Sequence, residues 1–356
     1  MAGTRVLVVD DSSTVRARLR EVIESDPRLQ VVGEASDGEQ AIALCEQVRP
    51  DVITMDMMLP LVNGLAATEQ VMAHYPTPIL IVSSSANRGD LLTTHDALAA
   101  GAVDVIEKPS CDGLDDDWER EFLAAVLLVS RIRVITHPLG RLRRNCEPDT
   151  AQFPIAGLFA TRGDCELVAI GASTGGPAAI VEVLRQLPGS FSLPVIAVLH
   201  IRASYADSLV QWLDGQTSRP VRFGVEGELV SEAAGQVIMA PPDQHIEVRA
   251  GQVHLTREPE RHSCRPSVDV LFESVAAEYG PKAVACLLTG MGRDGAAGLG
   301  LVRSGGGITI AQDERTCVLY GMPRAAVQLG AAEHVLPLDQ VGLALSTLAK
   351  RRKGDL

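Results

Sequence analysis

Short apolar runs rich in β-branched residues alternate with longer amphipathic stretches along most of this sequence. In the first 133 residues the apolar runs are residues 5–10, 30–35, 51–56, 78–83 and 103–108, and the amphipathic stretches are 13–24, 38–47, 64–73, 89–100 and 118–133. Strands that alternate with helices pair in parallel, and the helices cover both faces of the sheet. The pattern therefore predicts a five-stranded, doubly wound α/β domain of the flavodoxin-like kind.

A second series of the same kind starts at residue 167. Its strand-like runs are residues 167–171, 194–200, 237–240, 283–288 and 307–311, with a hairpin expected around 250–251. Between the two series, residues 131–164 lack periodicity and carry three prolines and a basic run at 141–144, as linkers do. A chain of 356 residues is long enough for two domains. We predict a first domain at 4–125, a linker at 126–165 and a second doubly wound parallel α/β domain at 166–352.

The net charge of −13 lies in the first domain, because residues 1–125 alone carry that excess and the rest of the chain balances. An acidic first domain and a nearly neutral second one disfavour nucleic acid, and with it a DNA-binding output domain, as a partner. The chain shows no hydrophobic signal sequence and no apolar run of the roughly 18 residues that a membrane span needs. The seven cysteines have no metal-type spacing. We expect a cytoplasmic protein that does not insert into membranes.

Polar residues stand at the ends of the predicted strands of the first domain. They are Asp10, Asp11, Asp56, Ser83 and Lys108. Because the carboxyl ends of parallel strands meet at one edge of the sheet, we expect these side chains to converge. Three carboxylates repel one another unless a cation neutralises them, and oxygen ligands suit Mg²⁺, so Asp10, Asp11 and Asp56 are candidate magnesium ligands. Asp56 could then attack a phosphoryl group while Lys108 offsets the charge and Ser83 binds the acyl phosphate.

This arrangement resembles the response-regulator receiver domain over residues 4–125. The resemblance rests on the five polar residues together with Pro60, Gly64 and the dipeptide Lys108-Pro109. It implies that Asp56 accepts a phosphoryl group from a histidine kinase and that Ser83 and Lys108 sense it. One residue departs from the pattern: Val105 stands where many receivers carry an aromatic switch residue.

In the second domain, the predicted strand 167–171 runs directly into a Gly171-x-Ser173-x-Gly175 turn and then a helix at 178–187. Small residues around a serine at a strand-to-helix turn are typical of a nucleophile elbow. A phosphate-binding loop is the first alternative, although the turn lacks the lysine of a Walker loop and the spacing of a dinucleotide loop. The second alternative is a plain turn in which Ser173 only caps the helix. The turn alone leaves esterase and plain turn open.

A base and an orienting carboxylate follow neighbouring strands. His200 ends the run 194–200, and Asp294 lies just after the run 283–288. A serine needs a histidine to remove its proton, and the imidazole needs a carboxylate to fix its tautomer. The chain order Ser, His, Asp differs from that of the α/β-hydrolases. His245 and His262 are weaker candidates for the base, and we expect the other five histidines at the surface.

Four segments carry a resemblance to the chemotaxis protein-glutamate methylesterase family, CheB. They are GASTGGP at 171–177, RPSVDVLF at 265–272, LLTGMGRDGAAGL at 287–299 and YGMPRAA at 320–326. The resemblance implies an esterase, without a cofactor in this domain, that hydrolyses glutamyl methyl esters of methyl-accepting chemotaxis receptors, releases methanol and deamidates glutamines. It implies Ser173 as nucleophile, His200 as base, Asp294 as its partner, and main-chain amides near Thr174 and Met291 as the oxyanion hole.

The family resemblance also implies regulation, in which the unphosphorylated receiver covers the esterase site and phosphorylation of Asp56 relieves the block. One departure lies beside the proposed base, where His200-Ile201-Arg202 replaces a His-Met-Pro-like sequence. This change motivates an alternative function, a phosphorylation-regulated binding or adaptor protein with impaired esterase activity.

Overall fold

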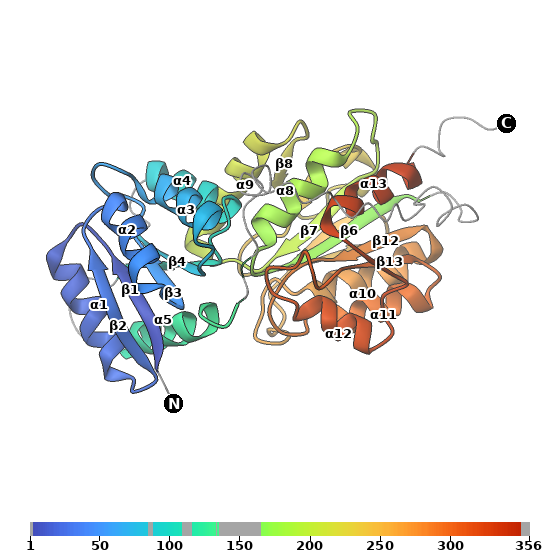
Figure 1. Ribbon diagram of the computed structural model, residues 1–356. Helices are drawn as coiled ribbons and strands as arrows, with labels where there is room; N and C mark the ends of the chain where they lie inside the picture. Colours follow the sequence, from blue (N-terminus) through green and yellow to red (C-terminus); the bar gives the residue numbers. More distant parts are fainter. Residues whose placement is uncertain (1–2, 85–87, 109–115, 133, 135–164, 350–356) are drawn as a thin grey trace. The chain divides into compact units, whose positions relative to one another are not determined.

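The chain folds into two units, and each is built on a parallel sheet with helices on both faces (Figure 1). The computed structural model describes residues 3–84, 88–108, 116–132, 134 and 165–349, without the side chains of 88–92 and 349. Contacts divide the chain into two units, Met1–Pro148 and Asp149–Leu356. Most of the predicted linker, including its basic run at 141–144, lies outside the described residues.

The sheet of the first unit has the order β2-β1-β3-β4-β5, and all its pairs are parallel. Its strands are β1 (Thr4–Val9), β2 (Leu29–Ala35), β3 (Val52–Met55), β4 (Ile79–Ser83) and β5 (Asp104–Glu107). Its helices are α1 (Ser13–Ser25), α2 (Gly38–Val48), α3 (Gly64–His74), α4 (Arg88–Ala99) and α5 (Asp116–Val129). This order is the flavodoxin-like one, as the sequence predicts.

Local sequence signals start the helices of this unit. The side chains of Ser12, Asp37 and Asn63 each accept a hydrogen bond from a main-chain N–H in the first turn of α1, α2 and α3. Helices α1 and α5 pack together on one face of the sheet, and α2, α3 and α4 form a row on the other (Figure 1). Helix α5 runs on to Val129, because Val126 and Val129 are buried in this unit. The first domain therefore extends past residue 125.

The second unit contains a seven-stranded, fully parallel sheet of order β14-β13-β12-β6-β7-β9-β8. Its strands are β6 (Leu167–Ala172), β7 (Val195–Leu199), β8 (Val221–Phe223), β9 (Val237–Met239), β12 (Ala283–Leu287), β13 (Ile308–Gln312) and β14 (His334–Leu336). The hairpin of β10 (His245–Arg249) and β11 (Gln252–Thr256) turns at the predicted residues. The sequence pattern misses the two edge strands, β8 and β14, because each is short and partly exposed and so does not form an apolar run.

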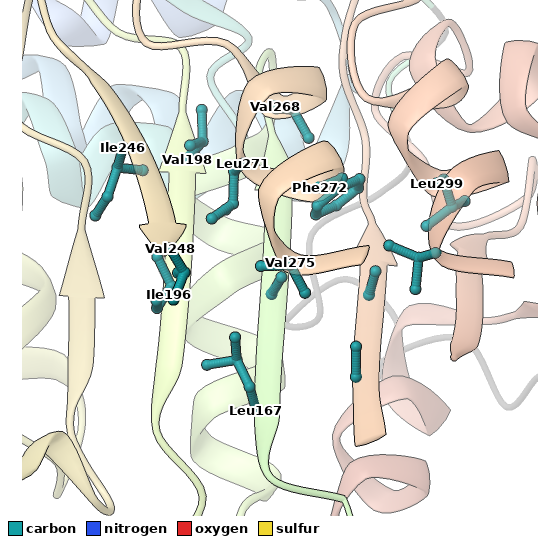
Figure 2. Close-up of a cluster of buried hydrophobic side chains, with 14 of the residues drawn as sticks. Leu167, Ile196, Val198, Ile246, Val248, Val268, Leu271, Phe272, Val275 and Leu299 are labelled. Atoms are coloured by element: carbon teal, nitrogen blue, oxygen red, sulfur yellow. The ribbon is translucent and has the colours of Figure 1, made fainter. Parts of the chain in front are cut away.

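The helices of this unit also form two layers (Figure 1). They are α8 (Gly176–Gln186), α9 (Ala203–Gln216), α10 (Val268–Tyr279), α11 (Ala296–Ser304), α12 (Met322–Gln328) and α13 (Leu338–Ala349). Helix α10 lays Val268, Leu271, Phe272 and Val275 over strands β6 and β7 and the hairpin (Figure 2). Because α10 packs on the central strands, its N-terminus reaches the edge of the sheet where those strands end. None of the described helices is both long and apolar enough to cross a membrane.

Candidate active site

Three neighbouring strands bring the predicted catalytic residues of the second unit to one edge of the sheet. Strand β6 lies between β7 and β12 and is parallel to both. Ser173 follows β6, His200 follows β7, and Asp294 lies in the loop after β12. Main-chain hydrogen bonds tie the loops together, with Ser173 N donating to Thr289 O at 3.0 Å and His200 N donating to Ala172 O at 3.1 Å.

The turn that carries Ser173 is tight and closely packed. Gly176 N donates to Ser173 O at 2.7 Å, and α8 starts at Gly176. Gly175 has a φ of 75°, a left-handed conformation that favours glycine. A Cβ at Gly290 would lie 2.7 Å from the Cβ of Ser173, so only glycine lets the loop after β12 approach the serine this closely. The GxSxG pattern and the neighbouring TGMG segment thus have a steric basis.

Asp294 is buried, and its carboxylate accepts hydrogen bonds from five groups. Oδ1 accepts from Ser267 Oγ, Asp269 N and Gly295 N, and Oδ2 accepts from Val268 N and His200 Nε2. Two of the donors are main-chain N–H groups in the first turn of α10, so Asp294 caps that helix. Burial by itself raises the pKa of the Asp294 carboxyl, but hydrogen bonds from His200 and Ser267 and the charge of His200 hold the pKa below its usual range.

His200 lies half-buried between Asp294 and a cysteine. Its Nε2 is 2.9 Å from Asp294 Oδ2, and its Nδ1 is 3.8 Å from Cys264 Sγ. Burial by itself lowers the pKa of the His200 imidazole, but its hydrogen bonds with Asp294 and Cys264 and the charges of these groups raise that pKa to about 9.

Ser173 Oγ makes no hydrogen bond with any residue that the structure describes. The structure thus joins two of the three predicted residues, His200 and Asp294, and places Ser173 on the adjacent strand end without contact to the imidazole. Catalytic hydrogen bonds commonly close only when substrate binds. Since Nε2 is bound to Asp294, Nδ1 is the nitrogen left to accept the serine proton.

The candidate oxyanion-hole amides lie in the two loops that meet at Ser173. Within the described part of the chain, neither Thr174 N nor Met291 N donates to a protein acceptor. Thr289 joins these loops, since its Oγ1 donates to Thr174 O at 3.0 Å and accepts from Leu319 N at 3.0 Å. Two main-chain donors are therefore available for a negatively charged oxygen.

Two of the other histidines have structural roles. The ring nitrogens of His245 are occupied by main-chain groups, Ser267 N at 3.1 Å and Pro259 O at 3.3 Å, and this ring is fully buried. His262 is bound to the buried Asp269 at 3.0 Å. The expectation of a surface position is wrong for His95, which is completely buried with α4, and burial lowers its pKa to about 4.

Three residues around the site were missed by sequence reasoning. They are Cys264, Ser267 and Asp269. All three precede or begin α10, which follows the hairpin of β10 and β11 and not a strand of the central sheet. A search at strand ends cannot find them. The one available signal is Ser267, a helix-capping residue type directly before an apolar periodic run.

The acidic residues of the first unit also converge. Carboxylate oxygens of Asp10, Asp11 and Asp56 lie within 4.8 Å of one another. Lys108 Nζ lies 2.8 Å from both Asp10 Oδ2 and Asp56 Oδ2. Burial raises the pKa of the Asp10 carboxyl even though Lys108 opposes it, whereas the two carboxylates outweigh burial and raise the pKa of Lys108. Clustered carboxylate oxygens suit a hard cation such as Mg²⁺.

The other residues of this acidic site lie on the adjacent strands. Ser83 is buried at the end of β4, and its carbonyl oxygen accepts from Lys108 N at 3.0 Å. Val105 is buried within β5. The structure therefore brings all five predicted residues to the carboxyl edge of the sheet.

A second group of metal-ligating residue types lies in the second unit. Ligand atoms of His200, Cys264 and Asp294 lie within 4.8 Å of one another. Both oxygens of Asp294 already accept hydrogen bonds, one of them from His200 itself. A metal ion here would have to break the His200–Asp294 bond, so the arrangement favours a thiol beside an imidazole over a metal centre.

Fold and site together define a class of protein: a response regulator in which a receiver-type domain precedes an α/β domain with Ser, His and Asp at the ends of its central strands. The family described as "Response regulator receiver domain" matches residues 6–114, and the family described as "CheB methylesterase" matches residues 168–345. The chain belongs to the CheB methylesterase family and carries an N-terminal receiver domain.

Curated relatives match over nearly their whole length. A "protein-glutamate methylesterase/protein-glutamine glutaminase" of Nitrosospira multiformis is 40% identical over 98% of this chain and 97% of its own. A second protein of that name, numbered 2, from Pseudomonas aeruginosa is 42% identical over 98% and 97% of the two chains. Among solved structures, the CheB methylesterase catalytic domain of Thermotoga maritima is 35% identical with a TM-score of 0.49, covering 52% of this chain and 100% of that one.

Proposed function

We propose that this protein is a phosphorylation-regulated protein-glutamate methylesterase and protein-glutamine glutaminase that acts on methylated chemoreceptors in the cytoplasm. The observation that carries the proposal is the hydrogen bond between His200 and the buried Asp294, at the ends of the strands that flank the one bearing Ser173. The names of the full-length relatives support the substrate class.

The chemistry follows from the positions of these groups. Ser173 Oγ attacks the side-chain carbonyl of a methylated glutamate while Nδ1 of a neutral His200 takes the hydroxyl proton. Amides of Thr174 and Met291 stabilise the oxyanion. His200 then gives the proton to the leaving oxygen and methanol departs. Water, deprotonated by His200, cleaves the acyl-enzyme, and a glutamine reacts by the same route with release of ammonia.

The receiver domain supplies the regulation. Asp56 is the phospho-acceptor, and a histidine kinase is the phosphodonor. Asp10, Asp11 and Asp56 would hold Mg²⁺, which neutralises charge on the transferring phosphoryl group when bound. Lys108 forms ion pairs with both Asp10 and Asp56, so its side chain would respond when phosphorylation changes the charge at Asp56. Ser83 would bind the acyl phosphate, and phosphorylation would relieve a block of the esterase site by the receiver.

The alternative, an adaptor with an impaired esterase, rests on the sequence His200-Ile201-Arg202. In the structure this departure leaves the bond between His200 and Asp294 in place, and Arg202 directly precedes α9. The enzyme is therefore the better-supported function.

Release of methanol from receptor membranes carrying labelled methyl esters tests the proposal. The full chain should release methanol, and a phosphodonor should stimulate release. We expect Ser173→Ala to lower the rate by about 10³-fold or more, and Asp56→Asn to abolish stimulation while leaving the basal rate. Full activity of the Ser173→Ala variant would refute the nucleophile. Continued stimulation of the Asp56→Asn variant would refute the phospho-acceptor.

A further inference from the structure

A thiol lies in the position that a catalytic serine would need to occupy at the imidazole of His200. Cys264 Sγ is 3.8 Å from His200 Nδ1, and the other ring nitrogen is bound to the buried carboxylate of Asp294. A nucleophilic sulfur, an imidazole and an orienting side chain in this order are the parts of a cysteine-hydrolase triad. The second unit thus places a second nucleophile, Cys264, at the imidazole that Ser173 is proposed to use.

A strained turn holds the thiol in place. His262 and Ser263 have φ values of 54° and 59°, and two main-chain hydrogen bonds between Arg261 and Cys264 close the turn around them. Such turns normally use glycine or asparagine at both central positions. Here the bond of His262 to the buried Asp269 holds the turn, and Cys264 Sγ also contacts His262 O at 3.4 Å.

Two more observations indicate a reactive thiol. Cys264 is partly exposed, whereas the other free cysteines among the described residues, Cys45, Cys165, Cys286 and Cys317, are buried. The neighbouring imidazole lies 3.8 Å from the sulfur and can accept the thiol proton, which generates the reactive thiolate.

We propose that Cys264, His200 and Asp294 form a second nucleophile–imidazole–carboxylate set, and that Cys264 is a site of covalent modification by peroxides and other soft electrophiles that inhibits the esterase. The inhibition rests on the proposed esterase function, whereas the thiol chemistry rests on the geometry at His200 and is independent of the receptor substrate.

Oxidation of Cys264 by a peroxide needs only the peroxide and the groups of this site. The Cys264 thiolate attacks one peroxide oxygen, the S–O bond forms and the O–O bond breaks. The departing hydroxide takes the proton of the His200 imidazolium and leaves as water. The sulfur is oxidised by two electrons to a sulfenic acid, and the peroxide is reduced. The new S–OH group then lies against Nδ1, the nitrogen that Ser173 requires, so proton transfer from the serine is blocked.

The size of the effect follows from thiol chemistry. General-base assistance by a well-placed imidazole contributes about 10²-fold or more to a rate. We expect about tenfold at Cys264, because its Sγ lies 3.8 Å from His200 Nδ1, which is longer than an ideal hydrogen bond. The titratable and charged groups around the pair are Asp294, Asp269, His262 and Arg261.

Alkylation of the full chain by iodoacetamide tests the thiol, with Cys264 followed by peptide mass spectrometry. We expect Cys264 to react about tenfold faster in the unchanged protein than in the His200→Gln variant. The matched control is His254→Gln, which changes a histidine bound to Glu226 and should leave the rate unchanged. Equal rates in the unchanged protein and His200→Gln, or an equal loss in His254→Gln, would overturn the proposal.

Peroxide treatment tests the inhibition through the ratio of esterase activity after and before treatment. In the unchanged protein this ratio should fall in step with sulfenic acid at Cys264, trapped with dimedone, and recover with dithiothreitol. In Cys264→Ala, or in Cys264→Ser if the alanine variant folds poorly, the ratio should stay near one. Equal inhibition with and without the thiol would contradict the proposal. If the protein releases no methanol at all, the proposed function fails while the alkylation experiment still decides the reactivity of Cys264.

Discussion

The raised pKa of His200 predicts that the free energy of unfolding of the second unit depends on pH. Burial opposes the charged imidazole, but Asp294 and Cys264 outweigh burial and raise the pKa from 6.5 to about 9. The folded state therefore holds this proton more tightly than the unfolded chain. The resulting stabilisation is complete below the unfolded pKa and disappears as the pH rises through the folded one. At 1.36 kcal/mol per pH unit, the shift corresponds to about 3 kcal/mol.

The tryptophans allow this stability to be measured in the full chain. The sequence has two, Trp118 in α5 of the first unit and Trp212 in α9 of the second. In a Trp118→Phe background, urea unfolding followed by fluorescence reports the second unit alone. We expect the stability difference between this protein and its His200→Gln derivative to fall by about 3 kcal/mol between about pH 6 and about pH 10.

A stability difference that changes by less than about 1 kcal/mol over this range would refute the reasoning. Free thiols titrate in the same window, near pH 8.5. Both measurements, on the Trp118→Phe protein and on its His200→Gln derivative, are therefore repeated with the additional substitution Cys264→Ser, which removes the thiol. The pH dependence should then become smaller but keep its sign, because the bond between His200 and Asp294 remains.

Two further predictions concern the buried carboxylates. Ser267→Ala removes a hydroxyl donor 2.7 Å from Asp294 Oδ1, and the loss of this bond to a charged group should cost about 1.5–3 kcal/mol in the same urea assay. A stability within about 0.5 kcal/mol of the parent would contradict it. Lys108→Gln leaves Asp10 and Asp56 without their shared cation and should destabilise the first unit by about 3–5 kcal/mol when Mg²⁺ is absent. Added Mg²⁺ should recover most of this loss, and no recovery would count against the magnesium site.

The central strands of both sheets could be predicted because they are buried on both faces and form continuous apolar runs. Strand β6 is an example, since all six of its residues are buried. The edge strand β14 could not be predicted, because it is short and carries the partly exposed His334 and the exposed Val335. Its place in the sheet comes from pairing with β13, which is a tertiary contact.

Candidate site residues were predictable where a rule of topology applies. Asp10, Asp56 and His200 follow parallel strands, so their convergence follows from the strand order. Ser267 and Cys264 come to the site by the packing of α10 and by a turn with two left-handed residues. The sequence around Cys264 does not predict such a turn, because His262 and Ser263 are not residue types that usually adopt two successive left-handed conformations.

The capping of α10 by Asp294 couples the imidazole to a helix. The carboxylate that holds His200 also accepts from two N–H groups in the first turn of α10, which begins 26 residues before Asp294. One carboxylate thus fixes both the histidine and the start of the helix, so a change at Asp294 should disturb both together.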